Sequence, residues 1–349
     1  MIRRLLRLIP RNLKNRLKVS FLGRFIMKLY YRSRILRRRP IGVTIELTSR
    51  CNLACTYCPK SGNLDMRVGD MPFDDFKMIL DSASEYVMEL EQVCLVGFGE
   101  PLLYPKLFDA IKYTKKVYPK TKVTITTNGR LLDEQVGANL IASGLDQMTI
   151  SLNTITNKRY EELVHSKGYD SLVENTKNFL LVLNEGGRTR TPHTFVQILD
   201  IVNSEAEMTE FVEYWQPYLS PNAEIQIQPF VNWAGEVNLP DNSQSLSESK
   251  VERYPCPHLF ATATSPIITR EGLALACCMA FPLNEDLILG SAFGIPLEEL
   301  YMGEKFKRLC GLHLKGEFNK IPACARCDAW RTGHNVWFWI KFLKWSRWL

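Results

Sequence analysis

Three cysteines lie close together near residue 50 and could act jointly as metal ligands. Cys51, Cys55 and Cys58 are spaced C-x3-C-x2-C and directly follow the apolar, β-branched run 43–47, which is typical of a buried strand. Three thiolates on one loop can hold three irons of a four-iron cluster and leave the fourth iron open to another ligand. A zinc knuckle and unconnected thiols are the alternatives, although zinc prefers four ligands in paired sets and no histidine lies nearby.

A second set of cysteines lies in the last third of the chain. Cys256 and Cys277 are separate in sequence, whereas Cys324 and Cys327 form a C-x2-C pair. Together they can complete a site with four ligands, and these residue types suit zinc and an iron–sulfur cluster equally well. The clustering of the ten cysteines, with no secretory signal visible, favours reduced, metal-binding thiols in the cytoplasm over disulfides.

Strand-like and helix-like stretches alternate after Pro40, and they must position the first cysteine loop. The segment 73–90 repeats apolar residues at helical spacing. Six such β/α units predict an α/β fold, a partial (β/α)6 barrel resembling a TIM barrel, whose chemistry lies at the carboxyl ends of the strands. The predicted strands are 43–48, 92–97, 122–127, 146–152, 194–201 and 223–229.

Small or polar residues recur at the ends of successive predicted strands, where the cysteine loop also lies. Each is a weak signal alone, because Asn-Gly is first of all a turn signal. Their recurrence at one edge of the sheet raises the expectation of a binding site. These residues are Gly97, Gly99, Glu100, Asn128, Ser151, Asn153 and, within the fifth strand, Gln197.

The cysteine loop, Gly-Phe-Gly-Glu-Pro at 97–101 and Thr-Thr-Asn-Gly at 126–129, in this order, resemble the radical S-adenosylmethionine (SAM) superfamily over about residues 43–230. The resemblance implies a [4Fe–4S] cluster on the three cysteines, with SAM bound to its fourth iron. Tyr57 would lie against the adenine, and Gly97, Gly99 and Glu100 would meet the methionine ammonium. Ser151 and Asn153 would contact the ribose or carboxylate, with Asn128 and Gln197 completing the predicted cofactor-binding set.

The resemblance also implies the reaction. One electron, supplied by a flavodoxin or ferredoxin, would cleave SAM to a 5′-deoxyadenosyl radical that abstracts hydrogen from an unactivated C–H bond. The protein's part would be to orient the substrate and exclude water.

The second cysteine set, C-x15-G-x4-C followed by C-x2-C, resembles the auxiliary-cluster domain called SPASM, or Twitch in its shortened form. The resemblance implies one auxiliary [4Fe–4S] cluster on Cys256, Cys277, Cys324 and Cys327. A second auxiliary cluster is not expected, because Gly333 stands where the full form has a further cysteine. With four protein ligands, the cluster would accept an electron from the substrate, which favours a two-electron oxidation, such as alcohol to ketone or a new cross-link, with redox-neutral epimerisation as the alternative.

The remaining cysteines and the five histidines are not assigned a catalytic role. Cys278 competes with Cys277 as a ligand, Cys310 is expected to be a spare, buried thiol, and Cys94 to lie in the core. No general base can be identified, because none of the five histidines lies in a recognisable motif; they are His165, His193, His258, His313 and His334.

Basic residues gather at both ends of the chain. Residues 1–39 hold eleven Arg and three Lys without an acid, and residues 331–349 add four more basic residues. Residues 40–330 therefore hold 26 basic against 37 acidic residues, a formal charge of −11. On helices, both ends would place basic and apolar or aromatic residues on separate faces, which favours peripheral contact with an anionic membrane. Packing against protein is the alternative, and nucleic acid is the least favoured partner.

The predicted organisation is a basic amphipathic segment (1–39), a radical SAM barrel (40–240), an auxiliary-cluster domain (250–332) and an aromatic basic helix (333–349). We expect a cytoplasmic oxidoreductase, peripheral on the inner face of the membrane, that acts on a small-molecule, carbohydrate or lipid-linked substrate. Maturation of a ribosomally made peptide is the alternative, and a non-catalytic metal-binding protein is less favoured.

Overall fold

The computed structural model describes residues 41–62, 68–86, 90–185, 192–201, 205–237, 253, 255–262, 265–280 and 284–331. Residues 1–39 and 333–349, with the amphipathic helices predicted there, lie outside these ranges. None of the helices within the described ranges is both long and apolar enough to cross a membrane.

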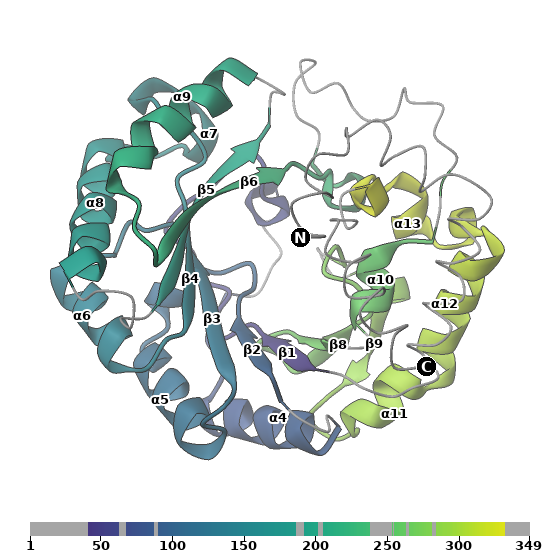
Figure 1. The fold of residues 1–349 in the computed structure, drawn as a ribbon. Helices are drawn as coiled ribbons and strands as arrows, with labels where there is room; N and C mark the ends of the chain where they lie inside the picture. The colour runs from purple at the N-terminus through teal and green to yellow at the C-terminus, as the bar shows by residue number, and fades with distance from the viewer. Residues whose placement is uncertain are drawn as a thin grey trace, which may run out of the picture.

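One curved sheet organises the described residues (Figure 1). Its first six strands are parallel neighbours in sequence order, so that their carboxyl ends meet at one edge. Val43, Val93 and Val123 lie side by side in register and are fully buried. The six predicted strands are confirmed as β1 (Gly42–Ile45), β2 (Gln92–Leu95), β3 (Lys122–Thr127), β4 (Gln147–Ser151), β5 (His193–Asp200) and β6 (Ala223–Pro229).

Helices cover the outer face of this sheet (Figure 1). The predicted helix after β1 buries Phe76, Ile79, Leu80 and Ala83 along one face, which is the spacing expected of an amphipathic helix. The helices are α4 (Phe73–Tyr86), α5 (Leu107–Val117), α6 (Glu134–Ala142), α7 (Asn157–Val164), α8 (Tyr169–Glu185) and α9 (Glu205–Trp215).

Local sequence determines where several helices begin and end. The side chains of Asp133 and Thr156 accept hydrogen bonds from backbone N–H groups in the first turns of α6 and α7. Gly316, with a φ of 80°, ends α12 (Glu304–Lys315) in the left-handed conformation that glycine adopts without a steric cost.

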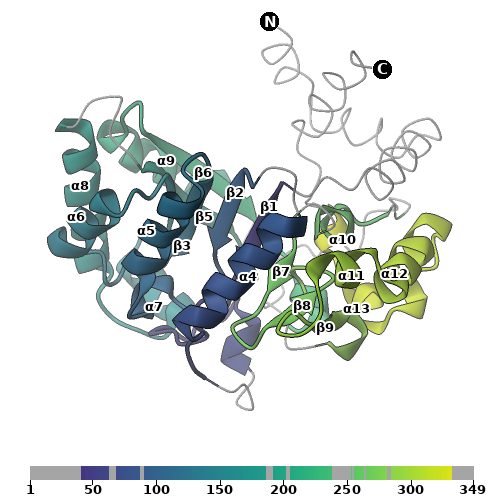
Figure 2. The same cartoon turned by 90° about the horizontal axis from the view of Figure 1, so that it is seen from below.

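The C-terminal part continues the same sheet rather than starting a separate one (Figure 2). β7 (Ile267–Ile268) pairs in parallel with β1, and β8 (Leu273–Leu275) and β9 (Ile288–Ser291) follow antiparallel. The hairpin of β7 and β8 is thus joined to the barrel by backbone hydrogen bonds between β7 and β1. Helices α10 (Pro257–Thr262), α11 (Leu297–Met302), α12 and α13 (Pro322–Arg326) pack beside it. Among the described strands the result is a partial barrel, whose sheet ends at β6 and β9 without closing.

Candidate active site

The first cysteine loop leaves the carboxyl end of β1 and keeps its three thiols close together. Cys51, Cys55 and Cys58 are half-buried and interact electrostatically with one another. Burial, followed by the neighbouring Cys58 and Cys51, raises the pKa of Cys55 to about 12. Backbone N–H groups face Cys51 and Cys58, and the Tyr57 hydroxyl faces Cys55. Donors that face clustered thiols are what thiolate ligands of an iron–sulfur cluster require.

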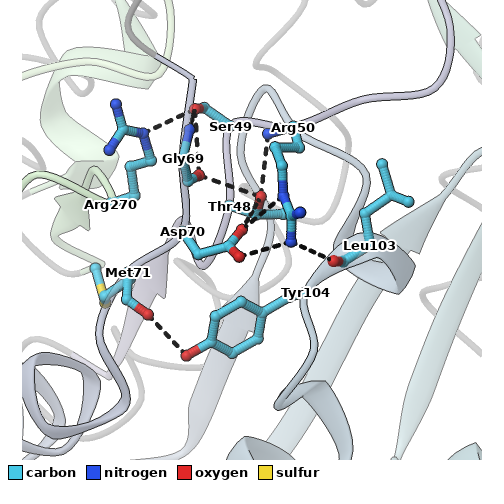
Figure 3. Close-up of polar contacts among 9 residues, drawn as sticks. All are labelled: Thr48, Ser49, Arg50, Gly69, Asp70, Met71, Leu103, Tyr104 and Arg270. Atoms are coloured by element: carbon cyan, nitrogen blue, oxygen red, sulfur yellow. Dashed lines mark hydrogen bonds and ion pairs between the residues drawn. The ribbon is translucent and has the colours of Figure 1, made fainter.

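An ion pair holds the start of this loop (Figure 3). The guanidinium of Arg50, next to Cys51, donates from Nε to Asp70 Oδ1 at 3.0 Å and from one terminal nitrogen to Oδ2 at 2.6 Å. The same terminal nitrogen donates to the carbonyl of Leu103 at 2.9 Å. Thr48 Oγ1 also donates to Asp70 at 2.7 Å. The loop is therefore fixed to the segment that follows it and to the turn after β2.

A second set of contacts joins the loop to the C-terminal hairpin (Figure 3). Arg270 Nε donates to Ser49 Oγ at 2.7 Å, and Ser49 Oγ accepts from Gly69 N at 3.1 Å. The carboxylate of Glu46, which is 8% exposed, accepts from Arg270 N at 3.2 Å and from Phe98 N at 2.9 Å. Burial raises the pKa of Glu46 above its usual value. No sequence motif marks Glu46 or Arg270, because their contacts join distant segments.

The side chain of Glu100, just after β2, forms hydrogen bonds with residues at the end of β3. It is 2% exposed, and its carboxylate accepts from Thr127 Oγ1 at 2.6 Å, from Asn128 N at 2.7 Å and from Leu102 N at 3.1 Å. Burial raises the pKa of this carboxyl group. The structure thus gives Glu100 three partners within the protein, and contact with a methionine ammonium stays a prediction.

The two glycines before Glu100 permit close packing of backbone. A Cβ on Gly99 would stand 2.1 Å from the carbonyl oxygen of Thr48, and one on Gly97 would stand 2.4 Å from Cγ of Glu46. Any side chain here would push the loop after β2 away from the cysteine loop. Packing within the protein therefore requires glycine at both positions, and a close approach of this backbone to SAM stays a prediction.

Four further predicted residues meet at the carboxyl ends of β4 and β5. Asn153, in a left-handed conformation with a φ of 64°, donates from Nδ2 to the Tyr57 hydroxyl at 2.7 Å. Gln197 Nε2 donates to Ser151 Oγ at 3.1 Å. The Oδ1 atom of Asn153 is buried without a hydrogen-bond partner. A buried, unpaired acceptor beside the cysteine loop suits a donor group of a bound ligand such as SAM.

Asn128 joins the end of β3 to the cysteine loop. Its Nδ2 donates to Asn52 Oδ1 at 2.8 Å and lies 4.0 Å from the sulfur of Cys51. The eight residues predicted to bind the cofactor therefore lie at the cysteine loop or at the strand ends next to it.

The second cysteine set also comes together. The buried Cys256 interacts electrostatically with the thiols of Cys277, Cys324 and Cys327. Burial, followed by neighbouring thiols, raises the pKa of Cys324 to about 12 and that of Cys327 to about 11. Burial alone raises the pKa of Cys310, which has no electrostatic interaction with the four.

Cys278 differs from the four in its surroundings. It hydrogen-bonds to its neighbour Cys277, and its sulfur lies 3.7 Å from His258 Nδ1. The choice of Cys277 rather than Cys278 as a ligand stays a prediction.

Each of the four gathered sulfurs faces a hydrogen-bond donor, which is the environment of cluster ligands. Met279 N donates to Cys277 at 3.4 Å, Leu259 N faces Cys256, and the N–H groups of Ala329 and Ala234 face Cys327. His313 Nε2 lies 3.4 Å from Cys324. Among the described residues, no three His, Cys, Asp or Glu side chains form a group placed to hold a single metal ion.

His313 is a site residue that sequence reasoning missed. Its side chain is fully buried on α12, and burial, followed by the charge of Arg253, lowers its pKa to about 3. The guanidinium of Arg253 interacts with three of the four thiols and donates to the carbonyl of Cys324 at 2.7 Å. No local motif marks either residue.

An aromatic contact links the two cysteine sites. The ring of Phe98, between the two glycines, lies edge-on to Trp233 with 5.4 Å between ring centroids. Trp233 and Ala234 adopt positive φ angles of 49° and 61°, a strained backbone for these residue types. This turn brings Trp233 to the loop after β2 and the N–H of Ala234 to Cys327.

Comparison with known proteins agrees with this arrangement. Residues 45–203 match the Radical SAM superfamily. The chain is 35% identical over 111 residues to the tungsten-containing aldehyde ferredoxin oxidoreductase cofactor-modifying protein of Pyrococcus furiosus, covering 32% of this chain and 30% of the relative. It is 27% identical over 197 residues to the GTP 3′,8-cyclase of Chlorobaculum tepidum, covering 54% of each. The chain therefore spans about a third to half of these curated relatives.

Solved structures share the fold. The structure of Streptococcus suis SuiB bound to S-adenosylmethionine has a TM-score of 0.60 at 17% identity, covering 79% of this chain and 68% of SuiB. BtrN in complex with AdoMet and 2-DOIA has a TM-score of 0.53 at 17% identity, covering 85% of this chain and 94% of BtrN. The part of the chain that matches the Radical SAM superfamily, residues 45–203, holds the cysteine loop and β2 to β5, and members of that superfamily bind a [4Fe–4S] cluster and SAM.

Proposed function

We propose that the protein is a radical SAM oxidoreductase that oxidises a carbon centre with the help of one auxiliary [4Fe–4S] cluster. The observation that carries this proposal is the second thiol set, in which Cys256, Cys277, Cys324 and Cys327 come together, each facing a hydrogen-bond donor. Four protein ligands leave no iron open to substrate, so this cluster serves electron transfer.

The residues of the chain have separable tasks. Cys51, Cys55 and Cys58 would hold the SAM-binding cluster, and the unpaired Oδ1 of Asn153 would accept a hydrogen bond from SAM. Glu100 keeps the ends of β2 and β3 in place around it.

When bound, the first cluster with SAM would supply a radical that takes a hydrogen atom from the substrate. The auxiliary cluster would supply an acceptor for one further electron, while a proton leaves. The substrate therefore loses two electrons in total. The proposed external electron donor is a flavodoxin or ferredoxin.

A small-molecule, carbohydrate or lipid-linked substrate is favoured. The basic ends, 1–39 and 333–349, would bring an anionic membrane surface to the barrel (40–240) and the auxiliary unit (250–332). The structure of BtrN in complex with 2-DOIA matches this chain over 94% of the length of BtrN and 85% of the length of this chain. SuiB, solved with the precursor peptide SuiA, has the same fold, and 69% of its length is covered.

Removing the auxiliary ligands tests the proposal. The double variant Cys324→Ala/Cys327→Ala should lose about four of about eight irons per chain and still form 5′-deoxyadenosine from SAM and dithionite. Cys310→Ala, which removes a buried thiol outside the set, is the matched control and should keep all irons. An unchanged iron content in the double variant would contradict the auxiliary cluster.

A further inference from the structure

The imidazole of His313 connects two of the proposed ligands of the auxiliary cluster. Its Nδ1 lies 3.2 Å from the backbone nitrogen of Cys256, and its Nε2 lies 3.4 Å from the sulfur of Cys324. These two cysteines lie on separate segments, and His313 stands on a third, the helix α12.

The first of these contacts determines which ring nitrogen carries the proton. A backbone N–H can only donate, so Nδ1 must accept from Cys256 and cannot itself bear hydrogen. The neutral ring then carries its hydrogen on Nε2, which faces Cys324. The neighbouring main chain thus makes His313 a donor to that sulfur.

The surroundings hold the ring in this orientation. Phe318 lies edge-on to the imidazole at 5.1 Å between centroids, and Phe260 lies edge-on at 6.5 Å. The ring is fully buried, so water does not compete for Nε2–H. For the other three ligands the donors are backbone N–H groups, which substitution leaves in place.

We infer that His313 is a positioning residue that raises the reduction potential of the auxiliary cluster by donating a hydrogen bond from Nε2 to Cys324. This inference rests on the proposed function. Reduction adds negative charge to the cluster and its thiolates, so a fixed donor stabilises the reduced form more than the oxidised form. The nearby guanidinium of Arg253 acts in the same direction. The cluster becomes a better acceptor for the electron that the substrate releases.

Three substitutions separate the two contacts of the ring. His313→Asn keeps an acceptor near the position of Nδ1 but removes the donor to Cys324. His313→Gln keeps an N–H near the position of Nε2, and His313→Phe removes both contacts. The auxiliary cluster can be observed alone in a full-length Cys51→Ala/Cys55→Ala/Cys58→Ala background, by a redox titration followed by electron paramagnetic resonance.

We expect His313→Asn and His313→Phe to lower the midpoint potential, and His313→Gln to restore most of it. A tenfold loss of preference for the reduced state corresponds to a shift of about 59 mV for one electron. An unchanged potential in His313→Asn and His313→Phe, or a shift in His313→Gln as large as in His313→Phe, would overturn the inference. Loss of the cluster from His313→Asn, which keeps the support of Cys256, would also overturn it. If the triple-alanine background itself binds no cluster, the proposed function fails instead.

Discussion

Asn232 and Asp328 exchange two hydrogen bonds between the barrel and the second cysteine set. Asn232 N donates to Asp328 Oδ1 at 2.8 Å, and Asp328 N donates to Asn232 Oδ1 at 3.1 Å. Asn232 Nδ2 also donates to the carbonyl of Arg326 at 2.9 Å. Because Asn232 follows β6 and Asp328 follows Cys327, this pair fixes the C-x2-C segment against the mouth of the barrel.

Replacing Asn232 with alanine should loosen the auxiliary site before the SAM site. The change removes the side-chain partners of Asp328 N and of the exposed Arg326 carbonyl. Because Asp328 is only half-buried, the expected cost is about 0.5–1.5 kcal/mol for each lost hydrogen bond. Chelator challenge of the reconstituted protein should therefore release the auxiliary irons faster than from wild type. Asn157→Ala, which breaks the exposed Asn157–Asp170 pair (2.8 Å), is the matched control. Equal release rates for Asn232→Ala and this control would argue against the linkage.

Arg50→Lys should weaken retention of the first cluster. Lysine keeps the charge but cannot reproduce the two parallel bonds to Asp70 and the bond to Leu103. The Arg50 side chain is 42% exposed, so solvent screening limits the expected effect to about two- to tenfold faster loss of iron to a chelator. Arg159→Lys, at an exposed pair with Glu162, is the control. If both lysine variants lose iron at the wild-type rate, the ion pair does not hold the loop.

Glu100→Gln should flatten the pH dependence of stability in the iron-free protein. Burial raises the folded-state pKa of Glu100 above 4.5, so the folded protein holds this proton more tightly than the unfolded chain. The resulting stability is fully present below pH 4.5 and is lost as pH rises through the raised value. Urea unfolding from pH 4.5 upward should therefore show a smaller decline for Glu100→Gln than for wild type. Glu46, shifted in the same direction, remains in both proteins. Parallel declines would contradict an elevated pKa for Glu100.

Removing residues 1–39 and 337–349 should abolish binding to vesicles with anionic lipids while SAM cleavage continues. The expectation rests on the separated basic and apolar faces of both ends. Cosedimentation with vesicles measures it, and vesicles of neutral lipid are the control. Undiminished binding by the shortened protein would exclude these ends as the membrane contact.

Sequence analysis can predict those features of the fold and the site that a local sequence pattern encodes. Strand periodicity located β1 to β6, and the spacing of Cys51, Cys55 and Cys58 indicated that these three thiols lie together on one loop. It missed Glu46 and Arg270, whose contact spans 224 residues, because no local pattern encodes a pairing between β1 and the C-terminal hairpin. It also assigned no role to His313, since only the folded chain brings α12 beside Cys256.

The position of β7 explains why the C-terminal part resembled a separate unit in sequence. Its two residues, Ile267 and Ile268, are too few to give a periodic signal, yet they pair with Thr44 and Ile45 of β1. The sheet is therefore continuous from β6 to β9.

The central claim is that Cys51, Cys55 and Cys58 support reductive cleavage of SAM. Anaerobically reconstituted wild type, given SAM and dithionite, should form 5′-deoxyadenosine. Cys55→Ala should form none, and Cys310→Ala should match wild type. Formation of 5′-deoxyadenosine by Cys55→Ala at the wild-type rate, or tightly bound zinc and no SAM cleavage in wild type, would contradict the account.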